Sequence, residues 1–212
     1  MVEEDVLKRV RKVKLLEENN RRLRYLSKEE CQALIDACAD HLRPIVVTAL
    51  NTGMRKGEIL SLKWENVDLN HKFILLDRTK NGERREIPIN ATLRATLIGI
   101  KRRLDISHVF YDQLTGSSYG DIKNSFNGAC KRAGINNFRF HDLRHTFASH
   151  LVMEGVDLTT VSRLLGHRDL TMTLRYSHLS PLHLSKAVDI LDNVLNNNTN
   201  YTKTIQLRGI QG

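Results

Sequence analysis

Six side chains in this sequence have the chemical types that a phosphoryl transfer needs. They are two arginines, a lysine, two histidines and a tyrosine: Arg55, Lys80, His141, Arg144, His167 and Tyr176. The planar fork of arginine holds two phosphate oxygens at once, and lysine and histidine exchange protons. A tyrosine hydroxyl becomes a nucleophile when a base or nearby cations assist it. Such a set could stabilise the charge of the transition state without a metal ion.

Arg55 opens a short predicted helix after the glycine break in TGMRKGE, residues 52–58. A helix N-terminus presents free N–H groups and the positive end of a dipole, which suits a phosphate. Glu58 follows three residues later on the same helix face, where its carboxylate can orient the guanidinium of Arg55. The alternative interpretation is a surface helix with an ordinary ion pair.

Lys80 lies in a region where the sequence pattern changes to strands. The apolar run 73–76 and the alternating segment 85–89 flank the dipeptide Asn81-Gly82. This dipeptide favours a two-residue hairpin turn because both of its residues tolerate positive φ. The pattern therefore predicts Lys80 at the tip of a β-hairpin, from which its ammonium could enter a groove. The alternative is a solvated lysine beside a turn.

His141 and Arg144 share one face of a predicted helix, because residues three apart are neighbours on a helix surface. A histidine beside a phosphate-binding arginine is suited to proton transfer near neutral pH. The spacing of His141 and His145 also fits zinc, but no HExxH pattern and no third ligand accompany them. A hydrogen-bonded core histidine is the other alternative.

His167 and Tyr176 form the last cluster. His167 follows the glycine that ends a predicted helix, and it can point a ring N–H at an anion. Tyr176 lies nine residues later on a short predicted helix. The alternative for Tyr176 is a partly buried aromatic side chain with a satisfied hydroxyl.

The elements around these residues are mostly helical. We expect helices from the capping box at Ser27, from Arg43 to Gly53, from Asn90 to about Leu104, from about Tyr119 to Ala133, from His141 to Glu154, from Asp157 to Gly166, from Leu170 to Ser177 and from Pro181 to about Leu195. Together with the hairpin they predict an α+β fold, mainly α-helical, with a small three-stranded antiparallel sheet.

The bulk composition favours a polyanionic partner. The chain has 212 residues and a formal net charge of +9, which suits nucleic acid or an anionic membrane surface. No stretch is apolar for long enough to span a bilayer, and the charged segment 1–11 lacks the apolar centre of a signal peptide. We therefore expect a cytoplasmic protein. Its three scattered cysteines indicate neither a disulfide framework nor a metal site.

In their combination and order, these clusters resemble the tyrosine recombinase, or phage integrase, family, close to its Xer-like and integron-like branch. The matching stretches are TGMRKGE (52–58), TKNGERREIPI (79–89), HDLRHTFASHL (141–151) and LLGHRDLTMTLRYSHL (164–179). We expect a charged linker or N-terminal helix at 1–24, the catalytic domain at 25–195 and a tail at 196–212. We hypothesise that the tail docks on a neighbouring protomer by adding a strand.

The resemblance implies how the scissile phosphate is bound. Arg55 and Arg144 would clamp it, and His167 would add a third hydrogen bond. Glu58 matches the supporting acidic position of the family, where it would help to order Arg55.

The resemblance also implies the chemistry. Tyr176 would attack the phosphate of double-stranded DNA and become linked to the 3′ end, while Lys80 would protonate the departing 5′ hydroxyl. His141 would accept the tyrosine proton. No cofactor and no metal ion is implied, and family members assemble as tetramers on DNA; we expect a monomer in isolation and no membrane partner.

Three other functions remain open. A type IB topoisomerase would use similar chemistry to relax supercoils. A non-catalytic DNA-binding protein on a recombinase-derived scaffold would be expected to lack one or more site residues. A metal-dependent nuclease would be sensitive to chelators.

Overall fold

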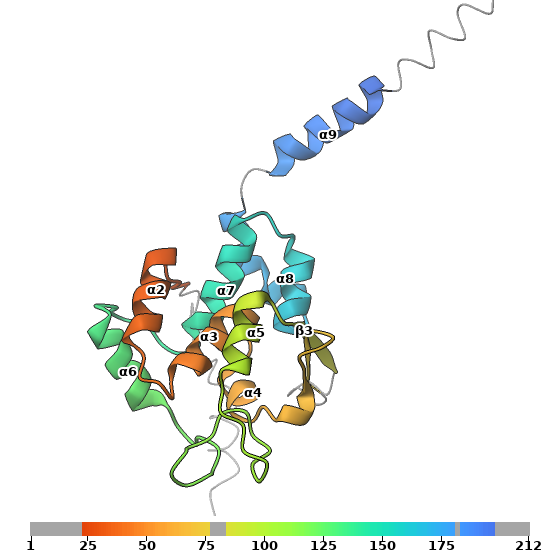
Figure 1. Ribbon diagram of the computed structural model, residues 1–212. Coiled ribbons are helices and arrows are strands. Elements are labelled where there is room, and N and C mark those ends of the chain that lie inside the picture. The colour runs from red at the N-terminus through yellow and green to blue at the C-terminus, as the bar shows by residue number, and fades with distance from the viewer. Residues whose placement is uncertain (1–22, 77–83, 181–182, 198–212) are drawn as a thin grey trace, which may run out of the picture.

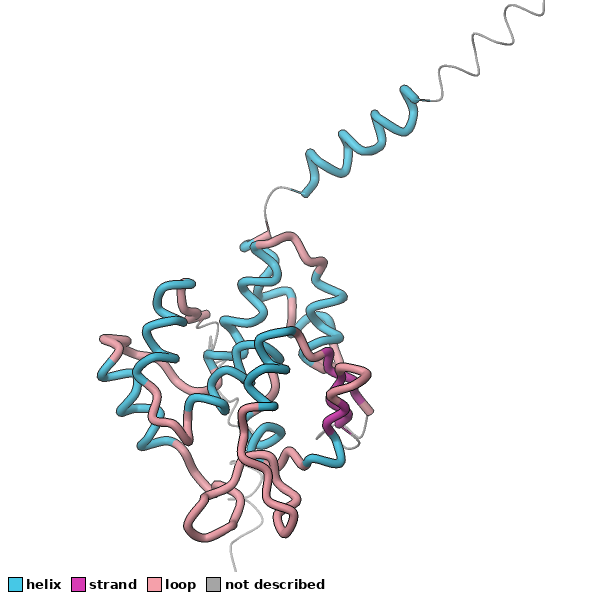
Figure 2. The backbone as a smooth tube through the Cα atoms, viewed as in Figure 1, coloured by secondary structure: helices cyan, strands magenta, loops and turns pink. Residues whose placement is uncertain are grey.

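The computed structural model describes residues 23–76, 84–180 and 183–197, and in the last range the side chains of 188–195. These residues form a mainly α-helical body with one three-stranded antiparallel sheet at its edge (Figures 1 and 2). The predicted α+β fold class is confirmed.

The first helices begin and end where their sequence signals predict. Helix α2 (Lys28–Ala37) starts with the predicted capping box. Helix α3 (Arg43–Thr52) has proline in its first turn and ends at Gly53, whose φ of 62° closes the helix in the left-handed conformation. This turn leads into the short helix α4 (Lys56–Leu60), and so it places the start of α4 beside the end of α3.

The sheet follows α4 and a single helical turn. The helical turn is the 3₁₀ helix η1 (Trp64–Asn66). The sheet consists of the strands β1 (Val67–Asp68), β2 (Phe73–Leu76) and β3 (Arg85–Pro88), in the order β1-β2-β3. Ile74 and Ile87 lie directly opposite each other and are buried, so they fix the face of the sheet that meets the core. The predicted hairpin tip with Lys80 lies outside the described residues.

Helices make up most of the second half of the chain. They are α5 (Ala91–Ile98), α6 (Lys123–Arg132), α7 (Asp142–Met153), α8 (Leu158–Leu165), the 3₁₀ helices η2 (Leu170–Met172) and η3 (Leu174–Leu179), and α9 (His183–Asn197). The short helix predicted at 170–177 is present as the two 3₁₀ helices η2 and η3, which are separated at Thr173.

Two helix boundaries also differ from the sequence prediction. α5 ends at Ile98 instead of about Leu104; Leu104 is 99% exposed, so no apolar face extends the helix beyond Gly99. α6 begins at Lys123 instead of about Tyr119, because Ser118 forms a β-bridge with Tyr111 and keeps the preceding segment extended.

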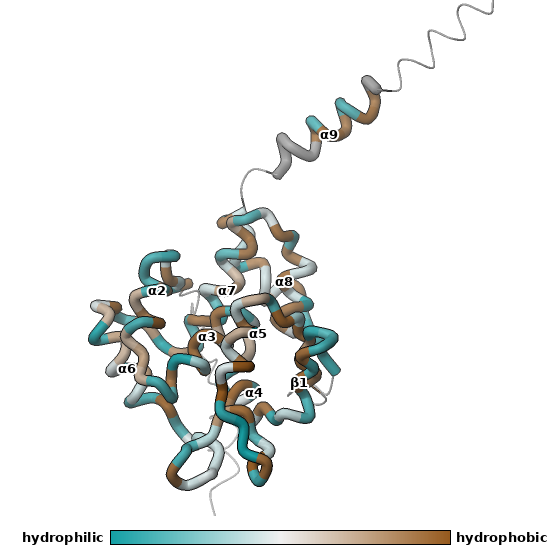
Figure 3. Tube along the Cα trace, in the orientation of Figure 1, coloured by the Kyte–Doolittle hydropathy of each residue, from teal (hydrophilic) through white to brown (hydrophobic). Residues whose placement is uncertain are grey.

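The core has two parts, and α7 belongs to both. The larger part packs α2, α3, α5 and α6 against the sheet. The smaller part consists of five buried residues on α7, α8 and η3: Ala148, Val152, Val161, Leu165 and Tyr176. Figure 3 shows hydrophobic residues along both α7 and α8. Because Tyr176 is part of the smaller core, the packing of α7 against α8 and η3 fixes its position.

Helix α9 lies clear of the helical body in Figure 1. Its described apolar side chains are 56–66% exposed: Val188, Ile190, Leu191, Val194 and Leu195. Among the described residues, no helix has both the length and the apolar character needed to cross a membrane.

Candidate active site

Five predicted site residues line one cavity of about 120 Å³: Arg55, His141, Arg144, His167 and Tyr176. They come from the start of α4, the first turns of α7, the segment after α8 and η3. The same cavity is lined by three further residues: His145, Met172 and Arg175. The fold therefore brings residues of four segments together around one cavity. Glu58 does not line the cavity but contacts Arg55, which does.

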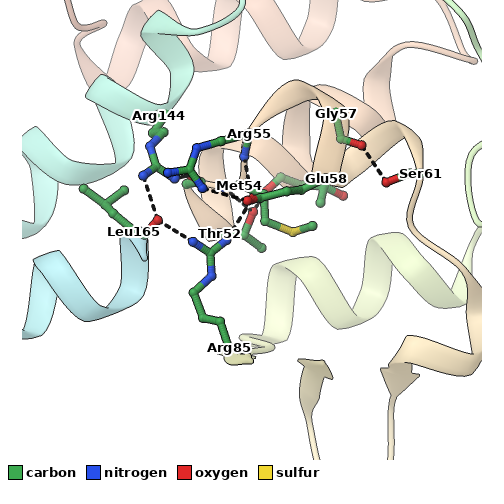
Figure 4. Close-up of polar contacts among 11 residues, drawn as sticks. Thr52, Met54, Arg55, Gly57, Glu58, Ser61, Arg85, Arg144 and Leu165 are labelled. Carbon is green, nitrogen blue, oxygen red and sulfur yellow. Dashed lines mark hydrogen bonds and ion pairs between the residues drawn. The ribbon is translucent and has the colours of Figure 1, made fainter. Parts of the chain in front are cut away.

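Glu58 holds two arginines. Its carboxylate accepts hydrogen bonds from the backbone N–H of Arg55 and from Nη1 of Arg55, both at 2.9 Å. Nη2 of Arg85, on β3, donates to the same carboxylate at 2.8 Å (Figure 4). Burial favours a raised pKa for Glu58, but the hydrogen bond from Arg55 and the charge of Arg85 keep the pKa below its usual value. Glu58 is therefore ionised and fixes the guanidinium of Arg55.

Arg144 is buried and tied to the backbone of two segments. Its Nη1 donates to the carbonyl of Gly53 at 2.6 Å. Its Nη2 donates to the carbonyl of Leu165 at 2.7 Å (Figure 4). Burial, together with the charges of Arg55 and Arg85, lowers the pKa of Arg144 to about 10. The guanidinium still carries its charge at neutral pH, and the ends of α3 and α8 set its orientation.

Tyr176 is 1% exposed, and its hydroxyl is hydrogen-bonded to a histidine. The partner is Nδ1 of His145, at 2.6 Å. Burial raises the pKa of Tyr176 to about 12, although the charges of Arg144 and Arg175 act in the opposite direction. The hydroxyl is therefore protonated at neutral pH, and a base must take its proton before it can attack.

His145 is suited to receive that proton. Its pKa is lowered to about 4, first by burial and then by the charges of His141 and Arg175, so the imidazole is neutral at pH 7. The sequence prediction considered His145 only as a possible zinc partner of His141. Its spacing of one helical turn from His141, next to Arg144, was the signal that could have placed it in the site.

His141 and His145 meet edge to face, with their ring centroids 5.1 Å apart and an interplanar angle of 90°. Burial, followed by the charge of Arg144, lowers the pKa of His141. In the part of the chain that the structure describes, no group of three His, Cys, Asp or Glu side chains is arranged to hold a metal ion.

His167 is held by a hydrogen bond behind the cavity. Its Nδ1 lies 2.7 Å from Oγ1 of the buried Thr173, which fixes the ring and leaves Nε2 for a ligand. Burial and the charges of Arg144 and Arg55 lower the pKa of His167 to about 4. The ring is neutral at pH 7, so it can meet an anion only as a hydrogen-bond donor and not as a cation.

The charges in the cavity suit an anion. Its described lining includes Arg55, Arg144 and Arg175 and contains no carboxylate, while the ionised Glu58 lies behind Arg55. Three guanidinium groups around a small cavity favour a group such as phosphate. The seventh predicted site residue, Lys80, lies outside the described residues.

Comparison with known proteins assigns the family. The phage integrase family model matches residues 24–183, and the chain belongs to this family. The integrase of Salmonella phage P22 is 33% identical over 198 residues, covering 86% of this chain and 50% of that protein. The tyrosine recombinase XerC of Staphylococcus carnosus is 36% identical over 155 residues, covering 68% of this chain and 51% of that protein.

Solved structures show the same fold. The catalytic domain of bacteriophage HP1 integrase has a TM-score of 0.65 and 32% identity, covering 79% of this chain and 95% of that domain. A crystal structure of XerA recombinase has a TM-score of 0.63 and 28% identity, covering 77% of this chain and 62% of that protein. The predicted tyrosine recombinase family and fold are confirmed, and the integron-like part of the predicted branch stays a prediction. The chain spans about half the length of the curated relatives it matches.

Proposed function

We propose that this chain is the catalytic domain of a site-specific DNA recombinase, which cuts and rejoins strands through a covalent 3′-phosphotyrosyl intermediate. The observation that carries the proposal is the single cavity lined by Arg55, Arg144, His167 and Tyr176. Membership of the phage integrase family supports it. We also propose the predicted catalytic domain at 25–195 and a cytoplasmic location.

The scissile phosphate binds between Arg55 and Arg144, and His167 donates a further hydrogen bond from Nε2. The cavity that these side chains line has a volume of about 120 Å³. Glu58 keeps the guanidinium of Arg55 in place. These groups act by stabilising the charge that develops on the phosphate oxygens in the transition state.

Tyr176 supplies the nucleophile. Its Oη forms a bond to phosphorus as the bond from phosphorus to the 5′ oxygen breaks, and Lys80 supplies the proton that this oxygen takes up. The phosphotyrosyl bond replaces a phosphodiester bond, so the reaction runs backward without ATP or a metal ion. The tyrosine proton goes to a histidine: His141 is the acceptor that the sequence predicts, and the 2.6 Å contact makes His145 a second candidate.

The proposed partner is double-stranded DNA, on which the chain assembles as a tetramer from monomers. A XerH site-specific recombinase of the same fold, 23% identical with a TM-score of 0.66, was solved bound to its difH substrate. The exposed apolar residues of α9, such as Leu191 and Leu195, support assembly because they have no partner within the described part of this chain.

The test is a covalent protein–DNA adduct. Because the target site is unknown, duplexes that bind the protein are first enriched from a random-sequence pool and are then nicked at successive positions. The nicked duplexes are incubated with EDTA present and resolved on a denaturing gel, and the linked residue is identified by peptide mass spectrometry.

Two matched variants show whether adduct formation depends on Tyr176. Tyr176→Phe removes the proposed nucleophile, and Tyr111→Phe removes another buried hydroxyl, which donates to the carbonyl of Lys101. We expect an adduct from the wild type and Tyr111→Phe but none from Tyr176→Phe. An adduct that survives Tyr176→Phe, or one that needs a divalent metal ion, would contradict the proposal.

A second assay separates recombination from topoisomerase activity. The adduct is supplied with a labelled strand that has a free 5′ hydroxyl, and a supercoiled plasmid carrying the same site is tested in parallel. Joining of the labelled strand between two duplexes supports a recombinase. Relaxation of the plasmid without such joining supports a type IB topoisomerase.

A further inference from the structure

Arg85 is a buried cation outside the predicted site. It lies on β3, its side chain is 7% exposed, and its Nη2 donates to Oε2 of Glu58 at 2.8 Å. Its Nη1 donates to the backbone carbonyl of Leu165, at the end of α8. Burying a guanidinium is costly unless its hydrogen bonds are made, so the two acceptors account for how Arg85 can be buried here.

Both acceptors of Arg85 are shared with a site arginine. The carboxylate of Glu58 also holds Arg55, and the carbonyl of Leu165 also holds Nη2 of Arg144 at 2.7 Å. Figure 4 shows the resulting chain of contacts, with Arg85 between the two shared acceptors. A shift of Arg85 must therefore disturb an acceptor of Arg55 and an acceptor of Arg144 together.

Gly166 provides a second, independent observation. A Cβ built on Gly166 would lie 2.1 Å from Nη1 of Arg85 and 2.9 Å from its Cδ. The residue has a φ of 64°, which glycine adopts without strain. Arg85 thus occupies space that is open because Gly166 has no side chain, and Gly166 directly precedes His167.

The buried position of Arg85 against Glu58 and Gly166 is not explained by stability alone. The Nε atom of Arg85 is buried and has no hydrogen-bond partner among the described residues. An unsatisfied buried donor costs about 1–3 kcal/mol. An apolar side chain of similar length would avoid this cost, but it could not connect Glu58 with the end of α8.

We propose that Arg85 is a positioning residue for strand cleavage, which sets the spacing and orientation of Arg55 and Arg144 through Glu58 and the carbonyl of Leu165. This inference rests on the proposed function. Arg85 itself does not contact the phosphate in this arrangement. Misplacing a catalytic group by about 1 Å can cost on the order of 100-fold in rate, so the loss of Arg85 should slow the chemical step and leave most of the DNA affinity intact.

The first variants change Arg85 itself. Arg85→Met keeps much of the length and removes the charge, while Arg85→Lys keeps the charge but loses the fork that reaches two acceptors. We expect the single-turnover rate of adduct formation to fall by about 100-fold in Arg85→Met and by about 10-fold or more in Arg85→Lys. DNA affinity should change by less than about threefold, because phosphate contacts across the duplex supply most of it.

A second pair of variants keeps Arg85 and guards against a simple folding defect. Gly166→Ala places a methyl group where Arg85 lies. Gly134→Ala introduces alanine at a similar φ of 69°, with no other atom within 4 Å of the new Cβ. Both variants carry the same backbone strain, so only Gly166→Ala should reproduce the rate loss of Arg85→Met.

A methylphosphonate at the scissile position separates positioning from general destabilisation. This group has one negative charge fewer than a phosphodiester, so its transition state depends less on two well-placed guanidinium groups. The ratio of the wild-type rate of adduct formation to the Arg85→Met rate should be about 10-fold smaller on this substrate than on the phosphodiester. An equal deficit on both substrates, or equal rates for Gly166→Ala and Gly134→Ala, would overturn the proposal.

Binding of tungstate, a stable tetrahedral dianion, tests the proposal without any reaction. If Arg85 presents Arg55 and Arg144 to an anion, its replacement by Met should weaken tungstate binding to the folded protein by about 10-fold, measured by calorimetry; unchanged binding also overturns the proposal. Failure of the wild type and of Gly134→Ala to form an adduct would instead contradict the proposed function, and the tungstate result would still decide the role of Arg85.

Discussion

The hydroxyl of Tyr176 lies 2.6 Å from Nδ1 of His145, and both side chains are buried. Burial raises the pKa of the tyrosine to about 12 and lowers that of the histidine to about 4. With such a gap, both groups are neutral at pH 7, and transfer of the proton from Tyr176 to His145 is unfavourable in this arrangement. Tyr176 therefore keeps its proton in this arrangement and must lose it as the hydroxyl attacks phosphorus.

The first prediction concerns the histidine that takes this proton. His145→Gln keeps a polar group beside Tyr176 but removes the base, so we expect adduct formation at pH 7 to slow by about 100-fold or more. The remaining rate should rise about tenfold per pH unit, because hydroxide must then ionise a tyrosine with a pKa of about 12. Single-turnover rates between pH 6 and 10 measure this.

Two further variants are measured in the same way: His141→Gln tests the alternative base, and His150→Gln is the control. His150 lies on the same helix and bonds the carbonyl of Leu26, outside the cavity, so His150→Gln should behave as the wild type. If His141→Gln shows the steep pH dependence and His145→Gln does not, then His141 is the base, as the sequence predicts.

The second prediction concerns stability in acid. The pKa of His145 is about 4 in the folded chain against an ordinary 6.5, so the unfolded chain binds this proton more readily. Stability should be complete above about pH 6.5 and should fall as the pH drops toward 4, by on the order of 3 kcal/mol from this residue. Urea unfolding at several pH values measures the slope.

The His145→Gln variant should lose that part of the pH dependence, whatever its stability at pH 7. His71→Gln is the control, because the His71 side chain is 78% exposed. Parallel pH profiles for the wild type and His145→Gln would mean that the buried histidine does not titrate as described.

The third prediction concerns Gly53, which has a φ of 62° and accepts a hydrogen bond from Arg144. A Cβ there would lie 2.5 Å from Cδ1 of Phe147 and 2.8 Å from Cδ2 of Leu165. We expect Gly53→Ala to lower the free energy of unfolding by about 2–4 kcal/mol, against about 1 kcal/mol for Gly134→Ala, which has strain without a clash. Equal losses in denaturant unfolding would show that the packing around Gly53 relaxes easily.

The fourth prediction concerns α9. Leu191 is 56% exposed, so Leu191→Asp should change the stability of the isolated chain by no more than about 0.5 kcal/mol. If α9 contacts a second protomer, the same change should abolish cooperative assembly on DNA, measured by gel shift and light scattering. Asn193→Asp adds the same charge at an exposed position of the helix, and it should assemble normally unless repulsion alone prevents assembly.

Local signals in the sequence were reliable where a few neighbouring residues decide the structure. The capping box at Ser27 and the glycines after α3 and α8 mark helix ends in both sequence and structure. The end of α5 was wrong by several residues, because Leu104 continues the pattern in the sequence but finds nothing to pack against. The burial of a side chain depends on residues that are distant in the sequence. A helix boundary that depends on burial therefore cannot be predicted from neighbouring residues alone.

The sequence by itself determined the family, the fold class and five of the residues that line the cavity, because these depend on side-chain types in a fixed order. Only the tertiary structure decided how these side chains are held. The contact of Tyr176 with His145 spans 31 residues, that of Arg85 with Leu165 spans 80, and that of Arg144 with Gly53 spans 91. Hydrogen-bond geometry and burial arise when separate segments pack together, and so do the pKa values that follow from them.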